Sequence, residues 1–230
     1  MCGFAGFLGS ECVEEEDKKR AVLMGDSLRH RGPDDSGVWI EPGFGIGVSH
    51  TRLSIQDLSS AGSQPMNSRS GRFVIAFNGE IYNFKELAGE LRESQYVLEG
   101  RSDTEVLLGC IECFGLKKTL SLIIGMFAFA LFDKRERQLI LVRDRVGEKP
   151  LYYGWQSGVF LFGSEIRALD THPACEAILN QRSIANLLAY SYIPDPDSIY
   201  CGVSKLLPGH SVVLSFDGSP GDESVSRWWS

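Results

Sequence analysis

Several features that would place this chain in a common class are missing from its 230 residues. No apolar run approaches the roughly 20 residues that a membrane-spanning helix needs. The N-terminus has neither a basic stretch nor a hydrophobic segment, so it lacks the pattern of a secretory signal. Basic residues are also outnumbered, because 23 Lys and Arg against 30 Asp and Glu give a net charge of −7. This balance argues against nucleic-acid or membrane-surface binding as the main activity.

Cysteine is sparse and scattered. Six cysteines in the whole chain do not make the dense framework of a small secreted fold, so we expect a reducing cytoplasm as the compartment. The one C-x-x-C pair, Cys110 and Cys113, lies in the apolar run 106–114. Both residues fit a helix core there, and no second Cys or His pair completes a zinc site. We therefore expect no metal.

Strand-like runs outnumber helical ones, and short turns join most of them. We expect strands at 3–9, 72–77 and 211–216 and hairpins over 37–50, 126–144 and 151–162. The pair Asn78-Gly79 is typical of a turn and is expected to end the strand at 72–77. Helices are expected over 14–30 and 182–190, and others to begin at caps on Asn83 and Ser102. This order favours antiparallel sheets with helices packed outside, in one large domain.

Cys2 is the most informative residue of the chain. Its small side chain behind the initiator makes Met1 removable, which would leave a thiol and a free α-amine on one carbon. An α-amine titrates near neutral pH, at about 7.7–8.0, far below a lysine. An amine held beside a thiol is a ready pair of base and nucleophile. Alternatively, Cys2 is only a small residue at the start of a strand.

Three further positions carry groups that suit one substrate. Arg52 ends a strand-like run, and its planar guanidinium matches a carboxylate. Asn78 and the backbone N–H of Gly79 can supply two donors to one oxygen, as an oxyanion hole requires. Asp103 stands at an expected helix start. Each motif has a structural alternative: an ion pair for Arg52, a turn for Asn78-Gly79, and a helix cap at Ser102 beside Asp103. Together with Cys2 they form the set needed to bind free glutamine and attack its side-chain amide.

Longer motifs around these positions resemble those of a known family. They are Met1-Cys2-Gly3, Arg29-His30-Arg31-Gly32-Pro33-Asp34, His50-Thr51-Arg52-Leu53-Ser54-Ile55, Phe77-Asn78-Gly79-Glu80-Ile81-Tyr82-Asn83, Ser102-Asp103-Thr104-Glu105, Gly125-Met126-Phe127-Ala128-Phe129-Ala130 and Arg143-Asp144-Arg145-Val146-Gly147-Glu148-Lys149-Pro150-Leu151-Tyr152. Together they resemble the class II glutamine amidotransferases, and within these the glutaminase domain of glutamine-dependent asparagine synthetases. The likeness runs in order over nearly the whole chain.

The resemblance implies an α+β fold, the four-layer αββα N-terminal-nucleophile hydrolase sandwich of two antiparallel sheets. It implies that Cys2 is the nucleophile with its own α-amine as base, and that Asn78 and Gly79 form the oxyanion hole. It further implies that these residues hold the substrate: Arg52 at the α-carboxylate, Glu80 and Asp103 around the α-amine, and Arg52, Leu53, Ser54 and Ile55 along the pocket wall. The products would be glutamate and ammonia, formed through a thioester on Cys2.

The resemblance also sets expectations for cofactors and partners. Relatives that make asparagine continue into a synthetase domain with a Ser-Gly-Gly-x-Asp-Ser loop, which does not occur here. We expect no cofactor for the glutaminase step, and ATP and Mg only in that second domain. Residues 1–216 would be the amidotransferase domain, and 217–230 a tail or the start of a linker. The expected partners are L-glutamine and a synthetase domain or subunit that amidates an acceptor, aspartate in our interpretation. We expect no nucleic acid and no membrane, and a homodimer stays open.

Two other functions compete with catalysis. Retained Met1 would keep the α-amine of Cys2 in a peptide bond, which favours a non-catalytic glutamine-binding or docking subunit. Alternatively, Trp228 and Trp229 near the end of the chain would be a surface for a partner. The tryptophans could equally fold back onto the domain itself.

Overall fold

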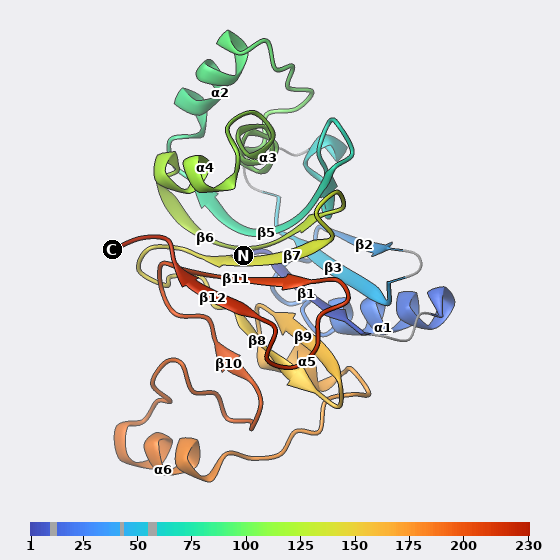
Figure 1. Ribbon diagram of the computed structural model, residues 1–230, viewed down its shortest axis with the longest axis vertical. Helices are drawn as coiled ribbons and strands as arrows, with labels where there is room; N and C mark the ends of the chain where they lie inside the picture. Colours follow the sequence, from blue (N-terminus) through green and yellow to red (C-terminus); the bar gives the residue numbers. More distant parts are fainter. Residues whose placement is uncertain (10–12, 42–43, 55–58) are drawn as a thin grey trace.

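Two antiparallel sheets of six strands each lie face to face at the centre of the computed structural model, which describes residues 1–9, 13–41, 44–54 and 59–230 (Figure 1). Sheet A has the strand order β10-β8-β9-β1-β3-β2, and sheet B has the order β12-β11-β7-β6-β5-β4. The strands are β1 (Gly3–Leu8), β2 (Asp35–Glu41), β3 (Ile46–Arg52), β4 (Met66–Asn67), β5 (Phe73–Ile81), β6 (Gly125–Asp133), β7 (Gln138–Arg143), β8 (Tyr152–Gln156), β9 (Val159–Gly163), β10 (Ser204–Lys205), β11 (His210–Ser215) and β12 (Ser224–Arg227).

Helices cover the outer face of each sheet, which gives four layers. The helices are α1 (Glu14–Asp26), α2 (Phe84–Glu93), α3 (Asp103–Phe114), α4 (Leu116–Leu122), α5 (Ile166–Asp170) and α6 (Gln181–Tyr190), with a 3-10 turn, η1, at Ser60–Gly62. Figure 1 shows α2, α3 and α4 on sheet B and α1 and α5 on the side of sheet A. This arrangement confirms the expected αββα sandwich of two antiparallel sheets. No helix in the described ranges is long and apolar enough to cross a bilayer.

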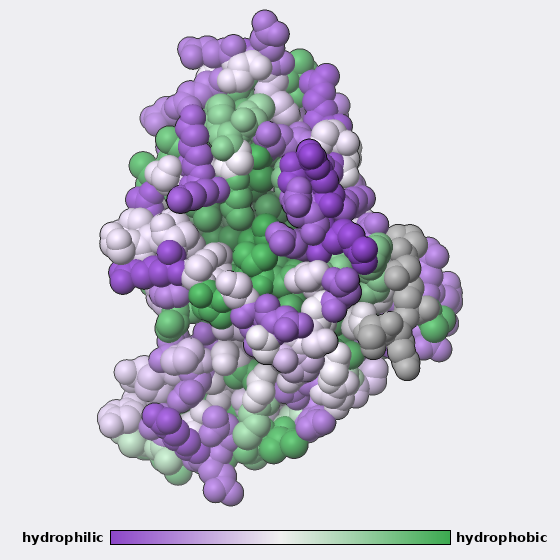
Figure 2. Space-filling view, in the orientation of Figure 1, coloured by the Kyte–Doolittle hydropathy of each residue, from purple (hydrophilic) through white to green (hydrophobic). Residues whose placement is uncertain are grey.

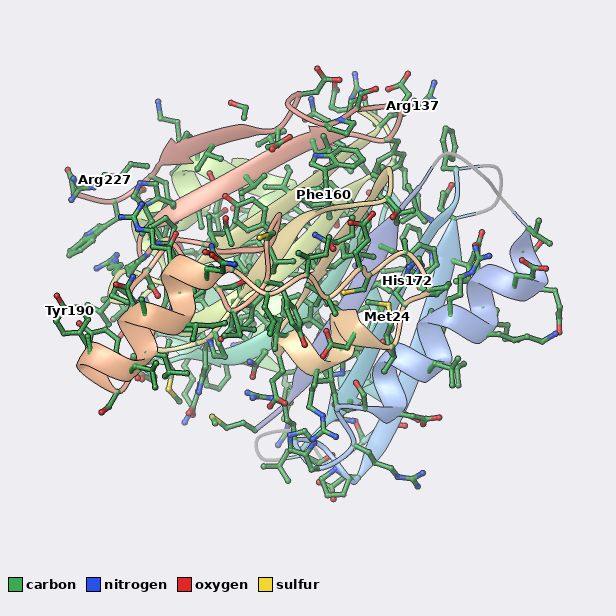
Figure 3. The ribbon with its side chains drawn as sticks, turned by 90° about the horizontal axis from the view of Figure 1, so that it is seen from below. Met24, Arg137, Phe160, His172, Tyr190 and Arg227 are labelled. Carbon is green, nitrogen blue, oxygen red and sulfur yellow. The ribbon has the colours of Figure 1, made fainter. Side chains whose placement is uncertain are left out.

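Three apolar layers hold these elements together. The middle layer lies between the sheets and includes Phe4, Phe132 and Phe160. A second layer joins sheet B to α2, α3 and α4, and Figure 2 shows apolar surface near these helices between hydrophilic borders. The third joins sheet A to α1 and α5 and includes Met24 and Phe7, and the His172 ring packs on Phe7 with centroids 4.8 Å apart; Figure 3 labels Met24 and His172. Burial of apolar surface on both faces of each sheet is the main stabilising contribution to such a fold.

Strand β5 is longer than the sequence pattern predicts. Asn78 and Gly79 do not form a turn but continue the strand to Ile81, in register with β6. Gly79 lies opposite Phe127, and a Cβ on Gly79 would collide with the carbonyl oxygen of Met126. The pairing with β6 therefore overrides the turn preference of the Asn-Gly pair, and the glycine is needed for close approach of two backbones.

The two expected helix caps have different outcomes. Ser102 caps α3, because its side chain accepts a hydrogen bond from Glu105 N. Asn83 is the N-cap residue of α2 as expected, but its side chain makes no capping hydrogen bond. The Asn83 side chain bonds instead to the backbone at Leu122 and Ile124, so it ties the start of α2 to the end of α4.

Residues 217–230 run back along sheet B. Strand β12 pairs with β11, and the Trp228 indole N–H donates to the carbonyls of Arg143 and His210 at 3.2 Å each. The Trp228 ring also stacks on Phe127 with centroids 6.1 Å apart. Helix α6 is different, because it lies away from the two sheets and leaves Tyr190 exposed (Figures 1 and 3).

Candidate active site

Cys2 directly precedes β1, and its sulfur lies against Leu53, the residue that follows β3. Leu53 N donates to Cys2 Sγ at 3.4 Å, and Leu53 O lies 3.7 Å from the same sulfur. Cys2 is half-buried and borders a cleft of about 100 Å³ between the ends of β3 and β5. The cleft is lined by Met1, Cys2, Arg52, Leu53, Gly62, Gln64, Phe77, Asn78, Gly79, Glu80, Ser102, Asp103, Thr104, Met126 and Lys149.

The backbone of Cys2 is clamped by an arginine that sequence reasoning did not single out. Arg31 Nε donates to Cys2 O at 3.0 Å, and Arg31 NH1 donates to Glu165 Oε1 at 2.7 Å. Burial alone would raise the pKa of Glu165, but hydrogen bonds from Arg31 and His30 hold that pKa below its usual value. The lowered pKa favours the anionic form of Glu165, which pairs with Arg31 and orients it. The only advance signal was the dense polar run from Arg29 to Ser36.

Asn78 borders the cleft, and its side-chain amide nitrogen has no hydrogen-bond partner among the described residues. The side chain is 1% exposed, and its Nδ2 is buried without a hydrogen-bond acceptor among the described residues. A buried donor left unpaired costs free energy, about 1–3 kcal/mol, and is therefore rare in native structures. An oxygen of a bound ligand would satisfy it.

The N–H of Gly79 faces the same space. Phe127, which pairs with Gly79, directs both its N–H and its carbonyl towards Asp144, at 3.2 and 2.8 Å. In an antiparallel ladder the residue opposite such a position directs its own N–H away from that partner strand. Gly79 N–H therefore points from β5 into the cleft that Gly79 borders. Together with Asn78 Nδ2, this N–H supplies the two donors that the sequence predicts for an oxyanion hole.

The backbone donors on either side of Gly79 are already occupied. Phe77 N donates to Gln64 Oε1 at 2.7 Å, and Ile81 N donates to Asp103 Oδ2 at 2.9 Å. Gln64 also donates to Thr104 at 3.3 Å, so it joins β5 to the first turn of α3. Gln64 was not predicted as a site residue, because nothing in its local sequence marks it. These bonds fix the edge of β5 around the free N–H.

Arg52 lies in the cleft wall as expected. It is 7% exposed, its NH1 donates to Ser59 O at 2.9 Å, and Gly62 leaves the room that its guanidinium occupies. Leu53 and Glu80 also border the cleft, whereas Ser54 does not. Ser54 N instead donates to Asp34 Oδ2 at 2.8 Å. Ile55, predicted as part of the pocket wall, lies outside the described residues.

Asp103 brings a carboxylate to the cleft from the first turn of α3. It is 7% exposed, and burial raises its pKa to about 6, with Glu80 adding to the rise and bonds from Ile81 N and Thr104 N opposing it. Carboxylates in such an environment ionise most readily when a cation comes beside them. The cleft therefore has an arginine and two carboxylates, the groups that suit the two charged ends of an amino acid.

His50 lies directly behind the cleft, between the two sheets. It is 1% exposed, its Nε2 donates to Phe77 O at 2.9 Å, and its Nδ1 has no partner among the described residues. Burial lowers the pKa of His50 to about 4, so the ring is neutral near pH 7. It bonds to the carbonyl next to Asn78 and thereby fixes that part of β5.

Nothing in the described part of the chain gathers three or more metal-binding side chains. The cleft itself presents a thiol, an amide, backbone N–H groups and charged side chains. Such a set can hold an amino acid and present its side-chain carbonyl to a sulfur nucleophile with two hydrogen-bond donors.

Comparisons with known proteins show which family the chain resembles over its length. The family model described as the glutamine amidotransferase domain matches residues 1–229. Asparagine synthetase (glutamine-hydrolyzing) 3 of Bacillus subtilis is 35% identical over 234 residues, which cover 100% of this chain and 37% of that protein. Asparagine synthetase (glutamine-hydrolyzing) 3 of Arabidopsis thaliana is 38% identical over 173 residues, which cover 74% of this chain and 28% of that protein. The chain thus spans about a third of the length of these curated relatives.

A solved structure has the same fold. The glutamine phosphoribosylpyrophosphate amidotransferase from Bacillus subtilis, complexed with ADP and GMP, matches with a TM-score of 0.72 and 19% sequence identity. The match covers 99% of this chain and 49% of that one.

Proposed function

Because this chain belongs to the class II glutamine amidotransferases and is homologous to glutamine-hydrolysing asparagine synthetases, we propose that its cleft converts L-glutamine to glutamate and ammonia through a thioester on Cys2. One observation carries this proposal. The sulfur of Cys2 borders the same small cleft as the buried, unpartnered Asn78 Nδ2 and the inward-facing N–H of Gly79. A nucleophile beside two unoccupied donors is the arrangement that acyl transfer requires.

The reaction begins once Met1 has been removed. The α-amine of Cys2 takes the thiol proton, and the sulfur attacks the side-chain carbonyl carbon of glutamine. The oxygen that becomes negative accepts hydrogen bonds from Asn78 Nδ2 and Gly79 N–H. The carbon–nitrogen bond then breaks, and the proton on the α-amine passes to the leaving nitrogen, which departs as ammonia. Water hydrolyses the thioester, which releases glutamate and restores the thiol.

Charged side chains orient the substrate in this proposal. Arg52 pairs with the α-carboxylate of glutamine, while Asp103 and Glu80 receive its ammonium group. The short aliphatic arm of glutamine then passes Leu53 on its way to Cys2. Holding the reacting atoms in place converts a bimolecular step into one that is effectively unimolecular. This step needs no metal ion or nucleotide.

We propose further that the ammonia passes to a synthetase part, which uses ATP and Mg²⁺ to activate an acceptor. Aspartate is the acceptor we favour, because the names of several relatives are those of asparagine synthetases. Residues 1–216 would be the amidotransferase domain, with 217–230 leading towards the synthetase. We also propose a cytoplasmic location, because Cys2, Cys110, Cys113, Cys175 and Cys201 are free thiols, as is usual in a reducing compartment.

Replacing Cys2 with alanine tests the catalytic role. We expect Cys2→Ala to abolish glutamate release from glutamine while glutamine still binds by calorimetry, since Arg52 and Asp103 remain. The matched control is Cys201→Ala, which removes an exposed thiol outside the cleft and should keep the parent rate. Equal rates for Cys2→Ala and the parent would refute the mechanism.

The intact mass of the purified protein separates catalysis from a binding role. Removal of Met1 frees the α-amine that the mechanism needs as its base. In the chain with Met1, the terminal amine donates instead to Arg31 O at 3.0 Å. A homogeneous protein that retains Met1 and binds glutamine without hydrolysing it would support the non-catalytic alternative.

A further inference from the structure

Lys149 is a buried cation in the same cleft, and none of the roles described above involves it. Its side chain borders the cleft together with Cys2 and Asn78, and the residue is only 4% exposed. Its Nζ lies 3.1 Å from Met1 Sδ. Within the described ranges, Lys149 forms no ion pair with a carboxylate. Removal of Met1 would therefore take away the thioether that the ammonium contacts.

The loop before Lys149 is built to hold it in place. Asp144, which is fully buried, accepts backbone N–H bonds at its two oxygens from Val146, Gly147, Glu148 and Lys149, at 2.7–3.1 Å. Arg143 Nε in turn donates to Lys149 O at 2.9 Å. Both backbone groups of Lys149 are thus fixed by buried charged side chains. The motif from Arg143 to Pro150 therefore fixes the backbone from which the Lys149 side chain extends to the cleft.

Five charged side chains surround the start of the chain, each from a different segment. Arg31 comes from the loop after α1, Arg52 from β3, Glu80 from β5, Asp103 from α3 and Lys149 from the loop after β7. Arg31 is paired with Glu165, and in the proposed reaction the two charged ends of glutamine pair with Arg52, Glu80 and Asp103. Among the described residues Lys149 has no carboxylate partner, and in the proposed complex the substrate supplies none.

Covalent geometry sets how near Lys149 lies to the reacting groups. Met1 Sδ is joined to the Cys2 nitrogen through the bonds of a single residue. With the 3.1 Å contact added, Lys149 Nζ lies within about 10 Å of that nitrogen. A fixed charge at this range, in a buried cleft, acts strongly on any neighbour that gains or loses charge.

We propose that Lys149 tunes the nucleophile, because its ammonium disfavours the protonated form of the Cys2 α-amine and favours the thiolate. A like charge makes a second cation harder to form, and an opposite charge makes an anion easier to form. Both effects favour the state in which the amine can accept the thiol proton at neutral pH. Lys149 thus acts through its charge on the amine and thiol of Cys2. This role rests on the proposed function of Cys2.

Lys149→Met tests the inference because methionine keeps an unbranched side chain of similar size and removes the charge. A unit charge at about 10 Å shifts a buried titration by about one pH unit. We expect the acidic limb of the pH profile of kcat/KM to move upward by about one unit in Lys149→Met. Lys149→Arg should restore the parent profile. Lys85→Met, at an exposed position on α2, is the control that should leave it unchanged.

A second measurement needs no turnover. The rate at which iodoacetamide alkylates Cys2, followed across pH by the mass of the N-terminal peptide, reports the thiolate directly. It is made on protein whose intact mass shows that Met1 has been removed. We expect the alkylation profile of Lys149→Met to move upward by about one unit as well. A parent without Cys2-dependent glutamate release would refute the proposed function, while this profile would still test Lys149.

Three results would overturn the inference. In the first, the profiles of Lys149→Met superimpose on those of the parent. In the second, Lys149→Arg behaves like Lys149→Met, which would assign the role to shape instead of charge. In the third, KM for glutamine rises while both profiles stay unchanged, which would make Lys149 a substrate-binding group.

Discussion

Asp103 Oδ2 accepts a hydrogen bond from the backbone N–H of Ile81 at 2.9 Å, which joins the first turn of α3 to the end of β5. The same carboxyl has a pKa raised by burial to about 6. It is therefore anionic only above that pH. In the proposed complex it pairs with the ammonium of glutamine, so its ionisation should control affinity.

We expect KM for glutamine to rise as pH falls below about 6, because a protonated Asp103 cannot pair with the ammonium. Asp103→Asn should raise KM about 10- to 100-fold above that pH, as expected for loss of a hydrogen bond to a charged group. The asparagine variant should also lose the dependence of KM on pH in this range. Steady-state kinetics across pH make the comparison, and a variant with the parent KM would contradict the role of Asp103.

The ionised form of Asp103 should favour substrate binding and lower the stability of the fold. Its pKa is higher in the folded protein than the ordinary 3.8, so its contribution to stability is present below pH 3.8 and is lost as pH rises through about 6. That loss amounts to about 3 kcal/mol. Asp103→Asn should therefore be at least as stable as the parent at pH 8, measured by urea unfolding. A large loss of stability would show that both carboxylate oxygens are needed structurally.

Local sequence patterns predicted the parts of the fold and site that depend on neighbours in the chain. The hairpins, the α3 cap at Ser102 and the end of β3 at Arg52 are all present, because each is set by residues within a few positions. The turn at Asn78-Gly79 is absent because β6 pairs across it. A partner strand that lies more than forty residues away in the chain has no trace in the local pattern.

Long-range hydrogen bonds account for the site residues that were missed. Arg31 is recognisable as functional only once Cys2 O lies beside it, and Gln64 only once Phe77 N does. His50 is polar and was expected near a strand end, yet its burial between the sheets decides its charge. These residues can be read from the sequence, but their roles depend on contacts that form only when the two sheets pack together.

Gly79 and Gly89 should respond in opposite ways to the same substitution. A Cβ at Gly79 would collide with the Met126 carbonyl, whereas a Cβ at Gly89, inside α2, meets no atom within 4 Å. We expect Gly79→Ala to lower the free energy of unfolding by about 1–3 kcal/mol. Gly89→Ala should raise it by about 1 kcal/mol, because alanine is the better helix former. Urea unfolding of both variants provides the test, and equal effects would place β5 and β6 further apart than described.

Asn78→Ala removes one donor of the proposed oxyanion hole without leaving a charge behind. Loss of one such donor typically lowers kcat by about 10²–10³. KM should change little, because the donor acts mainly on the transition state. Single-turnover kinetics of glutamate release would separate the two effects. A variant with the parent kcat and a raised KM would make Asn78 a binding residue.

The Arg31 clamp should matter for turnover more than for binding. Arg31→Met removes the donor to Cys2 O and the partner of Glu165, so the nucleophile loses its fixed orientation. We expect kcat to fall at least tenfold with a smaller change in KM, since a misplaced nucleophile weakens the attack more than it weakens binding. Arg29→Met, at an exposed position two residues earlier, is the control and should match the parent. Comparable losses in both variants would refute a specific clamp.

His50 should make the fold sensitive to acid. Burial lowers its pKa in the folded protein to about 4 from the ordinary 6.5, so the unfolded chain binds its proton more readily between these values. Stability is therefore fully present above about pH 6.5 and falls as pH drops towards 4. This loss is about 3 kcal/mol. His50→Gln keeps an N–H donor for Phe77 O but does not titrate, so the difference in unfolding free energy between pH 7 and pH 4.5 should shrink by about 2 kcal/mol. If this difference in unfolding free energy is the same in the variant and the parent, His50 is not the group that makes the fold sensitive to acid. His172, whose pKa is also lowered by burial to about 4, would then be the next residue to replace.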